Sequence, residues 1–416
     1  MEFLRTLALI IVFLALDWLA FKGVRFAFPL FFRRHQQGIH RAFVVQTVFM
    51  LAVVGGGAIF QQKVHDYRLV AVYYYFFAAV LMLYGPKMVF LVMLLPDLFF
   101  SRKYLKKQSM RHVHSDKLPH RCAKVGIIFG ILMFFLMVWG IVYGRHIFRV
   151  NRIEIVFSDL PEQFDGFRIL QISDLHTGSF FGNYSHFAHL ADSIAAAQAD
   201  LIVCTGDFVN FVADELLPVV PYLAKLEAPC GKLAILGNHD YGAYSKWKTA
   251  ADSIVHQRAL EHNIALTGFE LLKNSAVVIE KDSVNRIAIV GVENWGTRKR
   301  KKYPRRADIA AATASVSDIP FKILLSHDPT FWQKHIQGKS DIQLTLSGHT
   351  HGTQMGIQLG KFKFSPAQIM YPYWAGLYGD NNRYLYVNNG VGVIGFPGRI
   401  GMPPEITIFT LKRKSP

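Results

Sequence analysis

The sequence predicts an α/β domain that follows an N-terminal bundle of about four transmembrane helices. Long apolar stretches crowd the first 144 residues. After them, short apolar runs alternate with helix-like segments, which is the pattern of an α/β sheet domain. Five of the short runs end in polar clusters that contain Asp, His or Asn, and the carboxyl ends of such strands are where α/β sheets present ligands.

Four apolar stretches are long enough to cross a bilayer, which takes about 20 apolar residues. They lie at 4–21, 42–60, 69–100 and 125–144. The third stretch leaves open whether it forms one span or two, because Gly85-Pro86 interrupts it. A single helix of that length exceeds the bilayer core, so we expect a kink at Pro86 or a protrusion. Asp17, inside the first stretch, is expected to have a structural or interfacial role.

Basic residues are concentrated in the same part of the chain. Residues 1–150 contain 19 Lys and Arg against 5 Asp and Glu, a net charge of +14, whereas the rest carries +3. Charge placed beside apolar stretches is typical of membrane topology, and a nucleic-acid partner is not expected. The basic loops follow the first and third spans, so both should be cytoplasmic and residues 145 onward should lie outside the cytoplasm. Two spans within 69–100 would put these loops on opposite sides, which the same rule disfavours.

The character of the chain changes near Gly144. Residues 1–144 are interpreted as a membrane anchor, 145–164 as a linker with a first strand, and 165–416 as the α/β domain. Helical periodicity predicts helices at 186–198, 214–226 and 245–262. Apolar runs predict strands at 167–172, 201–205, 232–236, 286–290, 322–325, 342–346 and 384–387, and alternation predicts a half-exposed edge strand at 405–411.

The polar clusters at the strand ends contain seven potential metal ligands. Imidazole suits zinc and iron, and carboxylate suits manganese and magnesium as well. Seven ligands exceed what one four-coordinate ion needs and fit two ions that share a carboxylate. Two metals about 3.5–4 Å apart are a known device for displacement at phosphorus. The three cysteines form neither a Cys-x-x-Cys pair nor an even framework, so they predict no structural zinc site and no disulfide scaffold. The ligands are Asp174, His176, Asp207, Asn238, His327, His349 and His351.

The ordered motifs closely resemble those of the calcineurin-like metallophosphoesterase family over roughly residues 165–412. They are Asp-x-His at 174–176, Gly-Asp at 206–207, Gly-Asn-His-Asp at 237–240, a single His at 327 and Gly-His-x-His at 348–351. The membrane anchor and the ending around Gly398-Arg399-Ile400 look most like its transmembrane, YkuE-like branch. The resemblance implies a four-layer α/β/β/α sandwich of two mixed sheets. One departure is Thr353, where that branch usually has a second glycine.

The resemblance also implies a role for each motif residue. Asp174, His176, Asp207 and His351 would hold the first divalent ion, and Asp207 would bridge to the second, which Asn238, His327 and His349 complete. The ions would be manganese, iron, zinc or magnesium. His239 would contact the phosphate and protonate the leaving oxygen, and Asp240 would orient His239. The structural alternative for these last two residues is a turn or capping role.

The expected function is that of a membrane-anchored phosphoesterase acting through two metals and a bridging hydroxide. The motifs do not choose between a phosphodiester, which we favour, a pyrophosphate and a phosphomonoester. Tethering at a bilayer favours a lipid-linked substrate. A basic loop at 298–306 would attract anionic lipid or substrate, unless it is only a solvated loop. Aromatic residues would line a groove or pack in the core, and they are Phe180, Phe181, Tyr371, Tyr373, Trp374 and Tyr378.

Two alternatives stay open at this stage. One is a metal-containing but non-catalytic membrane protein that binds phospholipid or has a regulatory role. The other is a transporter or channel with an appended regulatory domain. Few charges lie within the predicted spans, which counts against an ion path.

Overall fold

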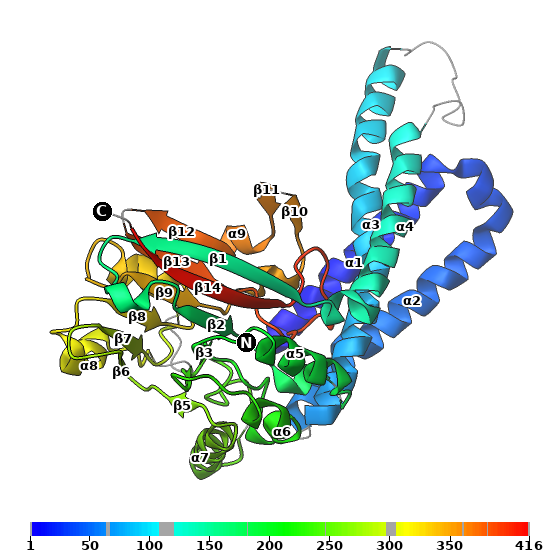
Figure 1. The fold of residues 1–416 in the computed structure, drawn as a ribbon. Coiled ribbons are helices and arrows are strands. Elements are labelled where there is room, and N and C mark those ends of the chain that lie inside the picture. Colours follow the sequence, from blue (N-terminus) through cyan, green and yellow to red (C-terminus); the bar gives the residue numbers. More distant parts are fainter. Residues whose placement is uncertain are drawn as a thin grey trace. The chain divides into compact units, whose positions relative to one another are not determined.

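The computed structural model describes residues 2–63, 67–107, 120–180, 182–245, 247–296, 305–359, 362–380 and 382–414. The chain divides into two compact units, Met1–Gly140 and Ile141–Pro416. The first is built of long helices and the second of strands and short helices (Figure 1).

Within the described residues, four helices of the first unit are long and apolar enough to cross a membrane. The stretch with Gly85-Pro86 forms one continuous helix, with Pro86 and Pro96 inside it. The helix of the second stretch has a kink at His35, where φ is −119°. The prediction of four apolar N-terminal helices is confirmed. The helices are α1 (Glu2–Ala27), α2 (Pro29–Lys63), α3 (Tyr67–Lys107) and α4 (Arg121–Val142).

Asp17 of α1 is buried and ties three of these helices together. Its Oδ2 accepts hydrogen bonds from Thr47 Oγ1 of α2 at 2.5 Å and from Tyr84 Oη of α3 at 2.6 Å. Its Oδ1 is paired with the ammonium group of Lys87, also on α3. Carboxylates inside spanning helices are costly unless they are paired, so Lys87 gives Asp17 the partner that the sequence did not reveal.

The second unit contains two six-stranded mixed sheets. In the first sheet the order is β1-β14-β2-β3-β4-β5. Strands β2 to β5 run parallel, and β14 lies antiparallel to β2 and parallel to β1. The strands are β1 (Arg149–Phe157), β2 (Arg168–Ile172), β3 (Leu201–Cys204), β4 (Lys232–Ala234), β5 (Glu270–Leu271) and β14 (Glu405–Arg413).

The second sheet has the order β12-β13-β9-β8-β7-β6. Its four central strands are parallel, and both edge strands are antiparallel to their neighbours. The strands are β6 (Ser275–Glu280), β7 (Arg286–Gly291), β8 (Lys322–Leu325), β9 (Leu344–Ser347), β12 (Gly376–Asp380) and β13 (Arg383–Val387). A separate two-stranded hairpin consists of β10 (Ile357–Leu359) and β11 (Phe362–Phe364).

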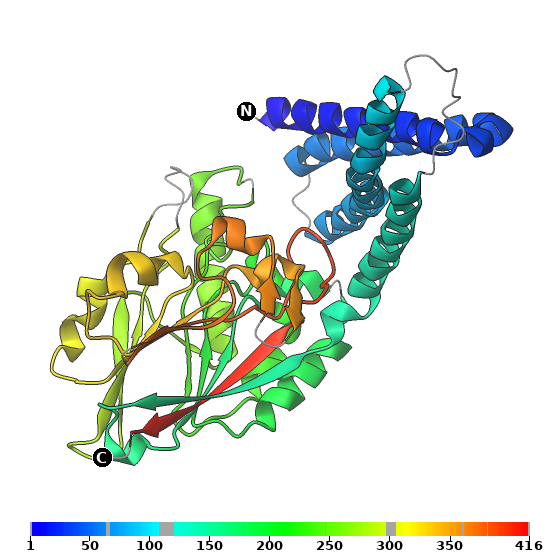
Figure 2. The same ribbon diagram turned by 90° about the horizontal axis from the view of Figure 1, so that it is seen from above.

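Three buried apolar clusters hold the layers together. The central cluster joins the facing sides of the two sheets and includes Ile169, Leu233 and Ile323. A second cluster packs the other side of the first sheet against α5 (Ser185–Ala195), α6 (Val220–Ala224) and α7 (Ala250–Leu266). The third packs the second sheet against α8 (Ile309–Thr313). These are the predicted four layers, α/β/β/α (Figures 1 and 2).

The interpretation of the last strand was wrong. We expected residues 405–411 to form a half-exposed edge strand, but β14 lies between β1 and β2 and is buried for most of its length. The polar residues that produce the alternation are satisfied inside the protein. Glu405 accepts hydrogen bonds from the Tyr386 hydroxyl and from Asn389 Nδ2, and Thr407 accepts one from Asn388 Nδ2.

Candidate metal centre

The carboxyl ends of five strands converge and bring the seven predicted ligands together. Asp174 and His176 follow β2, Asp207 follows β3, and Asn238 lies four residues after β4. From the second sheet, His327 follows β8, and both His349 and His351 follow β9. Since all five are parallel-sheet strands, their carboxyl ends lie at the same end of the sandwich.

The backbone at these positions is unusual. Asp174, His176, Asp207, His349 and His351 have φ between 41° and 75°, a region that residues with a Cβ rarely adopt. Such conformations persist only where the surrounding structure enforces them, and they cluster at functional sites. Gly237 and Gly348 complete these turns, because a Cβ at either position would collide with a carboxylate oxygen of Asp207 or Asp174.

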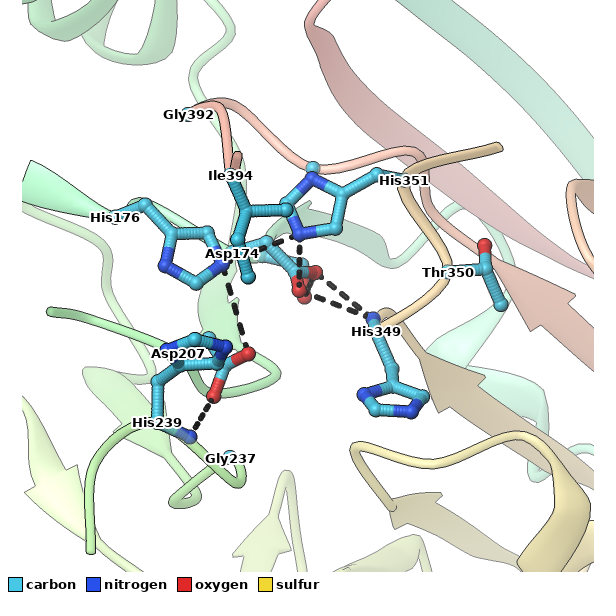
Figure 3. A network of polar contacts seen from close by, with 12 residues as sticks. Asp174, His176, Asp207, Gly237, His239, His349, Thr350, His351, Gly392 and Ile394 are labelled. Atoms are coloured by element: carbon cyan, nitrogen blue, oxygen red, sulfur yellow. Dashed lines mark hydrogen bonds and ion pairs between the residues drawn. The ribbon is translucent and has the colours of Figure 1, made fainter. Parts of the chain in front are cut away.

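Three residues form the first group of converging donor atoms. His176 Nε2 lies 3.1 Å from His351 Nε2, which in turn lies 3.3 Å from Asp174 Oδ1 (Figure 3). Asp174 is further held by the Ser173 hydroxyl and by the backbone N–H of His349. The carboxylate on the first sheet therefore also fixes the turn on the second sheet that carries two of the histidines.

The second group surrounds His327. Its Nε2 lies 3.1 Å from Asn238 Oδ1, 3.2 Å from His349 Nδ1 and 3.2 Å from Asp207 Oδ2. The same Asp207 oxygen lies 3.6 Å from His176 Nε2 of the first group. Asp207 therefore touches both groups.

These atoms are arranged to bind a cation and not to hydrogen-bond to one another. His176 Nδ1 lies 3.2 Å from the Val209 carbonyl and His327 Nδ1 lies 2.7 Å from the Thr205 carbonyl, so both Nδ1 atoms carry the proton. The Nε2 atoms then present lone pairs, and they face carboxylate, amide and imidazole acceptors. Acceptors that converge in a buried place require positive charge between them, and divalent metal ions supply it.

The electrostatics of the site point the same way. Burial lowers the pKa of His327, but the Asp207 carboxylate beside it more than offsets this and raises the pKa to about 10. Burial raises the pKa of Asp174, yet His351 more than compensates, so the pKa falls below its usual range. A proton on His327 thus balances the Asp207 charge where a cation would otherwise do so, whereas burial lowers the pKa of His176 and of His349.

His239 lies beside the two groups of donor atoms and is held by three contacts. Its Nδ1 donates to the Asn210 carbonyl at 2.7 Å, and its backbone N–H donates to Asp207 Oδ1 at 2.8 Å. Its ring stacks on Tyr244 with centroids 4.0 Å apart. His239 also comes close enough to His176 and Asp207 for the three to form a ligand triad, so geometry alone permits either a ligand or a proton-transfer role.

Asp240 makes different contacts from those that the resemblance implied. Its carboxylate accepts hydrogen bonds from the backbone N–H groups of Asp207, Phe208 and Gly237, each at 2.8 Å. The Nδ1 of His239 instead faces the Asn210 carbonyl. Asp240 therefore holds the backbone of the turn that presents Asp207, and burial together with the Asp207 charge raises its pKa to about 8.

Three further residues contact the predicted ligands, and the sequence did not assign them. The Tyr244 hydroxyl accepts from Asn238 Nδ2 at 2.8 Å, and the Tyr371 hydroxyl lies 3.0 Å from His349 Nε2. The fully buried Arg399 lies 3.3 Å from His351 Nδ1 and donates to the Gly392 carbonyl. Tyr371 and Arg399 stand in segments that the sequence had singled out, whereas nothing in the pattern marks Tyr244.

The other aromatic residues mostly serve packing. Trp374 is buried against Ala367, Ala375 and Met402, and the rings of Tyr373 and Tyr378 are in contact. Phe180 belongs to the core, whereas Phe181 lies outside the described residues. Most of the basic loop also lies outside them.

The two described arginines of the basic loop, Arg305 and Arg306, lie over the rings of Trp295 and Tyr241. At the position where the related branch has glycine, Thr353 adopts φ 51°, and its hydroxyl lies 2.9 Å from Ser365 Oγ.

Two family models match the chain. The model described as "Calcineurin-like phosphoesterase" matches residues 167–353, and that described as "Probable Calcineurin-like phosphoesterase, transmembrane domain" matches residues 3–145. The "Uncharacterized metallophosphoesterase YkuE" of Bacillus subtilis is 31% identical over 270 residues, which cover 64% of this chain and 86% of that protein.

Two other relatives extend the comparison. A "Transmembrane protein with metallophosphoesterase domain" from Danio rerio is 28% identical over 67% of this chain, which spans only 60% of that longer protein. The "UDP-2,3-diacylglucosamine pyrophosphatase LpxG" of Chlamydia trachomatis is 28% identical over 65% of this chain and 92% of its own length. With its four apolar helices and its clustered Asp and His side chains, this chain belongs to the calcineurin-like phosphoesterase family of hydrolases, whose members use divalent metal, and it is a membrane protein.

Proposed function

We propose that this chain hydrolyses a phosphodiester or pyrophosphate bond at a centre of two divalent cations. The observation that carries the proposal is the position of Asp207 Oδ2, 3.6 Å from His176 Nε2 and 3.2 Å from His327 Nε2. One carboxylate thus belongs to both groups of donors, as two ions side by side require. Such ions, when bound, activate water as the nucleophile and neutralise charge on the phosphoryl oxygens.

We assign the ligands as two sets that share Asp207. Asp174, His176 and His351 complete the first set, and Asn238, His327 and His349 complete the second. The convergence of ring nitrogens with carboxylate and amide oxygens supports this division. A mixture of nitrogen and oxygen donors suits manganese, iron, zinc or magnesium, which remain the proposed ions.

We assign to His239 the delivery of a proton to the leaving oxygen. Its Nδ1 is engaged by the Asn210 carbonyl and its ring rests on Tyr244, so Nε2 is the atom left to meet substrate. A histidine held on both sides in this way presents one nitrogen in a fixed direction, which general acid catalysis requires. Asp240 supports the same turn through the backbone rather than through the ring of His239.

A lipid-linked substrate is the best supported class. The domain follows a membrane-spanning helix, and one relative carries the name of a pyrophosphatase for a diacylated nucleotide sugar. We take residues 1–144 as the anchor, 145–164 as linker and first strand, and 165–416 as the phosphoesterase domain. The basic loops after the first and third spans support an extracytoplasmic position for that domain.

Replacing Asp207 tests the two-metal proposal most directly. Asp207→Asn removes the shared charge, so the full chain in nanodiscs should bind less metal and lose more than about 100-fold in turnover of bis-p-nitrophenyl phosphate. Metal per chain would be measured by mass spectrometry after loading with manganese, zinc, iron or magnesium. The exposed Asp318→Asn, which affects only a surface pair with Arg286, is the matched control.

Two outcomes would reject the proposal. Normal turnover by Asp207→Asn would show that the shared carboxylate is not needed. Absence of hydrolysis by the parent protein with every metal, on diester and pyrophosphate substrates alike, would instead favour a non-catalytic membrane protein that binds phospholipid.

A further inference from the structure

A small insert separates His351 from Tyr371, which contacts His349. It consists of the hairpin β10–β11 followed by α9 (Ala367–Met370). Among the described residues, the two strands pair only with each other, so the hairpin belongs to neither sheet (Figure 1). The insert therefore lies beside the proposed metal centre without contributing to the sheets that build it.

The hairpin is amphipathic, but its apolar face is exposed instead of packing on a core. Ile357 pairs with Phe364 and Gln358 pairs with Lys363, so the register puts Ile357, Phe362 and Phe364 on one face. Their exposed fractions are 50%, 61% and 47%. The polar positions lie on the other face, and Gln358 is bonded to the body of the domain.

The helix that follows adds to this apolar surface. Ile369 is 84% exposed and Met370 is 56% exposed. Five large apolar side chains are thus exposed between residues 357 and 370, a density that marks a contact surface for a protein, a ligand or a membrane. We call Ile357, Phe362, Phe364, Ile369 and Met370 the docking face.

The insert is fixed to the turn that carries His351. The Ser365 hydroxyl donates to the Gly352 carbonyl at 2.6 Å, and Ala367 is buried against Trp374 and Met402. The exposed side chains therefore project from an anchored element.

The short connection between the last candidate span and the insert favours a bilayer as the partner of the docking face. The fourth candidate span ends at His146, three residues before Arg149. Three residues of extended chain reach about 10 Å at most. Arg149 Nη1 donates to Gln358 Oε1 at 2.7 Å. The hairpin is thus hydrogen-bonded to the first residue of β1, close in sequence to the end of the candidate span. The connection between the candidate span and the strand that holds the hairpin is therefore only a few residues long.

The charge of the insert agrees with a membrane partner. Residues 355–375 include Lys361 and Lys363 and no Asp or Glu. A segment that exposes apolar side chains and carries lysines but no acidic residues has the composition of segments that contact anionic membranes, although Lys363 lies on the face of the hairpin opposite the docking face.

We propose that the docking face inserts into the interfacial region of an anionic bilayer and sets the metal centre against the lipid headgroups. The docking itself does not depend on the reaction. Its effect on turnover rests on the proposed function, because a lipid-linked substrate then reaches the centre without leaving the membrane.

Spin labels on the full chain in nanodiscs test the docking. Labels would be placed by Phe362→Cys and by Ile369→Cys, in a chain with Cys122→Ser and Cys230→Ser, in discs containing phosphatidylglycerol. We expect both labels to be accessible to oxygen and shielded from a nickel chelate. The control is Val284→Cys in the turn between β6 and β7, where the side chain is 81% exposed and the label should collide freely with nickel.

Two results would overturn the docking proposal. In the first, labels at 362 and 369 collide with nickel as freely as the label at 284. In the second, they are shielded but show spin–spin broadening that vanishes on dilution with unlabelled protein, which would identify a second copy of the chain as the partner.

A second measurement tests the effect on turnover. The double variant Phe362→Ser, Ile369→Ser should hydrolyse soluble bis-p-nitrophenyl phosphate normally but lose about tenfold on a diacylglycerol p-nitrophenyl phosphate ester embedded in the disc. Equal losses on both substrates, or no loss on either, would reject this effect. If the parent protein hydrolyses neither ester, the proposed function fails, while the spin labels still decide the docking.

Discussion

Backbone carbonyl groups decide which nitrogen of two central histidines faces the metal site. The Thr205 and Val209 carbonyls take the Nδ1 protons of His327 and His176, so each Nε2 is left as a lone-pair donor. Both carbonyls belong to the segment that follows β3, whereas His327 comes from the other sheet. One loop thus sets the protonation of proposed ligands on both sheets, which is a common way to prepare a histidine for metal.

Tyr244 should matter because it serves two neighbours at once. Its hydroxyl accepts from Asn238 Nδ2, which keeps Oδ1 turned toward His327, and its ring supports His239. Tyr244→Phe keeps the ring and removes the hydroxyl, so we expect about tenfold weaker metal binding at the Asn238 set, measured by titration of metal-free protein.

Comparison with Tyr244→Ala separates the two contributions. Loss of the ring should lower turnover further at saturating metal, because His239 is then supported on one side only. Tyr222→Phe, in a residue that packs against Phe187, serves as the control. Equal metal affinity in Tyr244→Phe and the parent would show that the Tyr244 hydroxyl does not support metal binding.

The sequence was most informative at this scale, and for a physical reason. Each proposed ligand directly follows a buried strand or lies a few residues beyond it, so a polar cluster after an apolar run marked its position. Tyr244 reaches the site through a turn six residues beyond Asn238, and no local pattern encodes that reach. The contact of Asp240 with backbone N–H groups was equally invisible, because it depends on where the β3 loop passes.

Among the elements, the loop after β3 is held by two buried carboxylates. Asp240 binds its beginning, and Glu215 accepts hydrogen bonds from the backbone N–H groups of Asn210 and Phe211 further along. Asn210 in turn presents the carbonyl that orients His239. The shape of this loop therefore links Glu215 to the proposed acid.

Glu215 should make the stability of the domain depend on pH. Burial raises its pKa to about 8, although backbone N–H donors oppose the shift. Between about pH 4.3, where an unfolded Glu titrates, and pH 8, the folded protein holds a proton that the unfolded chain has lost. The contribution of Glu215 to the free energy of unfolding is therefore greatest at low pH and is lost as the pH rises toward 8. Thermal unfolding at about pH 5, 6.5 and 8 should show the decline.

Glu215→Gln stays neutral throughout that range. Its thermal midpoint should consequently change less with pH than that of the parent protein. The exposed Glu270→Gln on β5 provides a comparison for the general effect of removing a carboxylate. Identical pH slopes in the parent and Glu215→Gln would mean that Glu215 is already ionised in the folded state.

Elements were predicted less well where polar residues are buried. The alternation of β14 indicated an exposed edge, but Glu405 and Thr407 find their partners inside the protein. Likewise, one helix was expected over 214–226, and the structure has two short 3₁₀ turns followed by α6. Pro218 and Pro221 lie in this stretch, and proline interrupts the hydrogen bonding of a longer helix.

At the scale of the whole molecule, a buried ion pair fixes the helices of the membrane unit. Asp17→Asn would leave the Lys87 ammonium group without its charge partner, and breaking one side of a buried pair costs about 3–5 kcal/mol. The double variant Asp17→Leu, Lys87→Met should recover part of this loss. Thermal unfolding of the full chain in detergent would measure both, and equal midpoints for single and double variants would contradict a pairing role.

Topology gives a second prediction at this scale. Basic residues follow the first and third spans, and the described residues contain four candidate spanning helices. Because positive loops stay in the cytoplasm, alkaline phosphatase fused after Pro416 should be active and a green fluorescent protein at the same position should be dark. The opposite pair of signals would place the catalytic domain in the cytoplasm.

The place of β14 has a consequence for biosynthesis. Residues 405–413 come after every proposed ligand in the chain, yet they form the second strand of the sheet that presents Asp174 and Asp207. While the ribosome is still adding these residues, β1 has no neighbour and β2 is an open edge. The sheet that presents Asp174 and Asp207 therefore cannot be completed until residues 405–413 have been synthesised, which is after every proposed ligand.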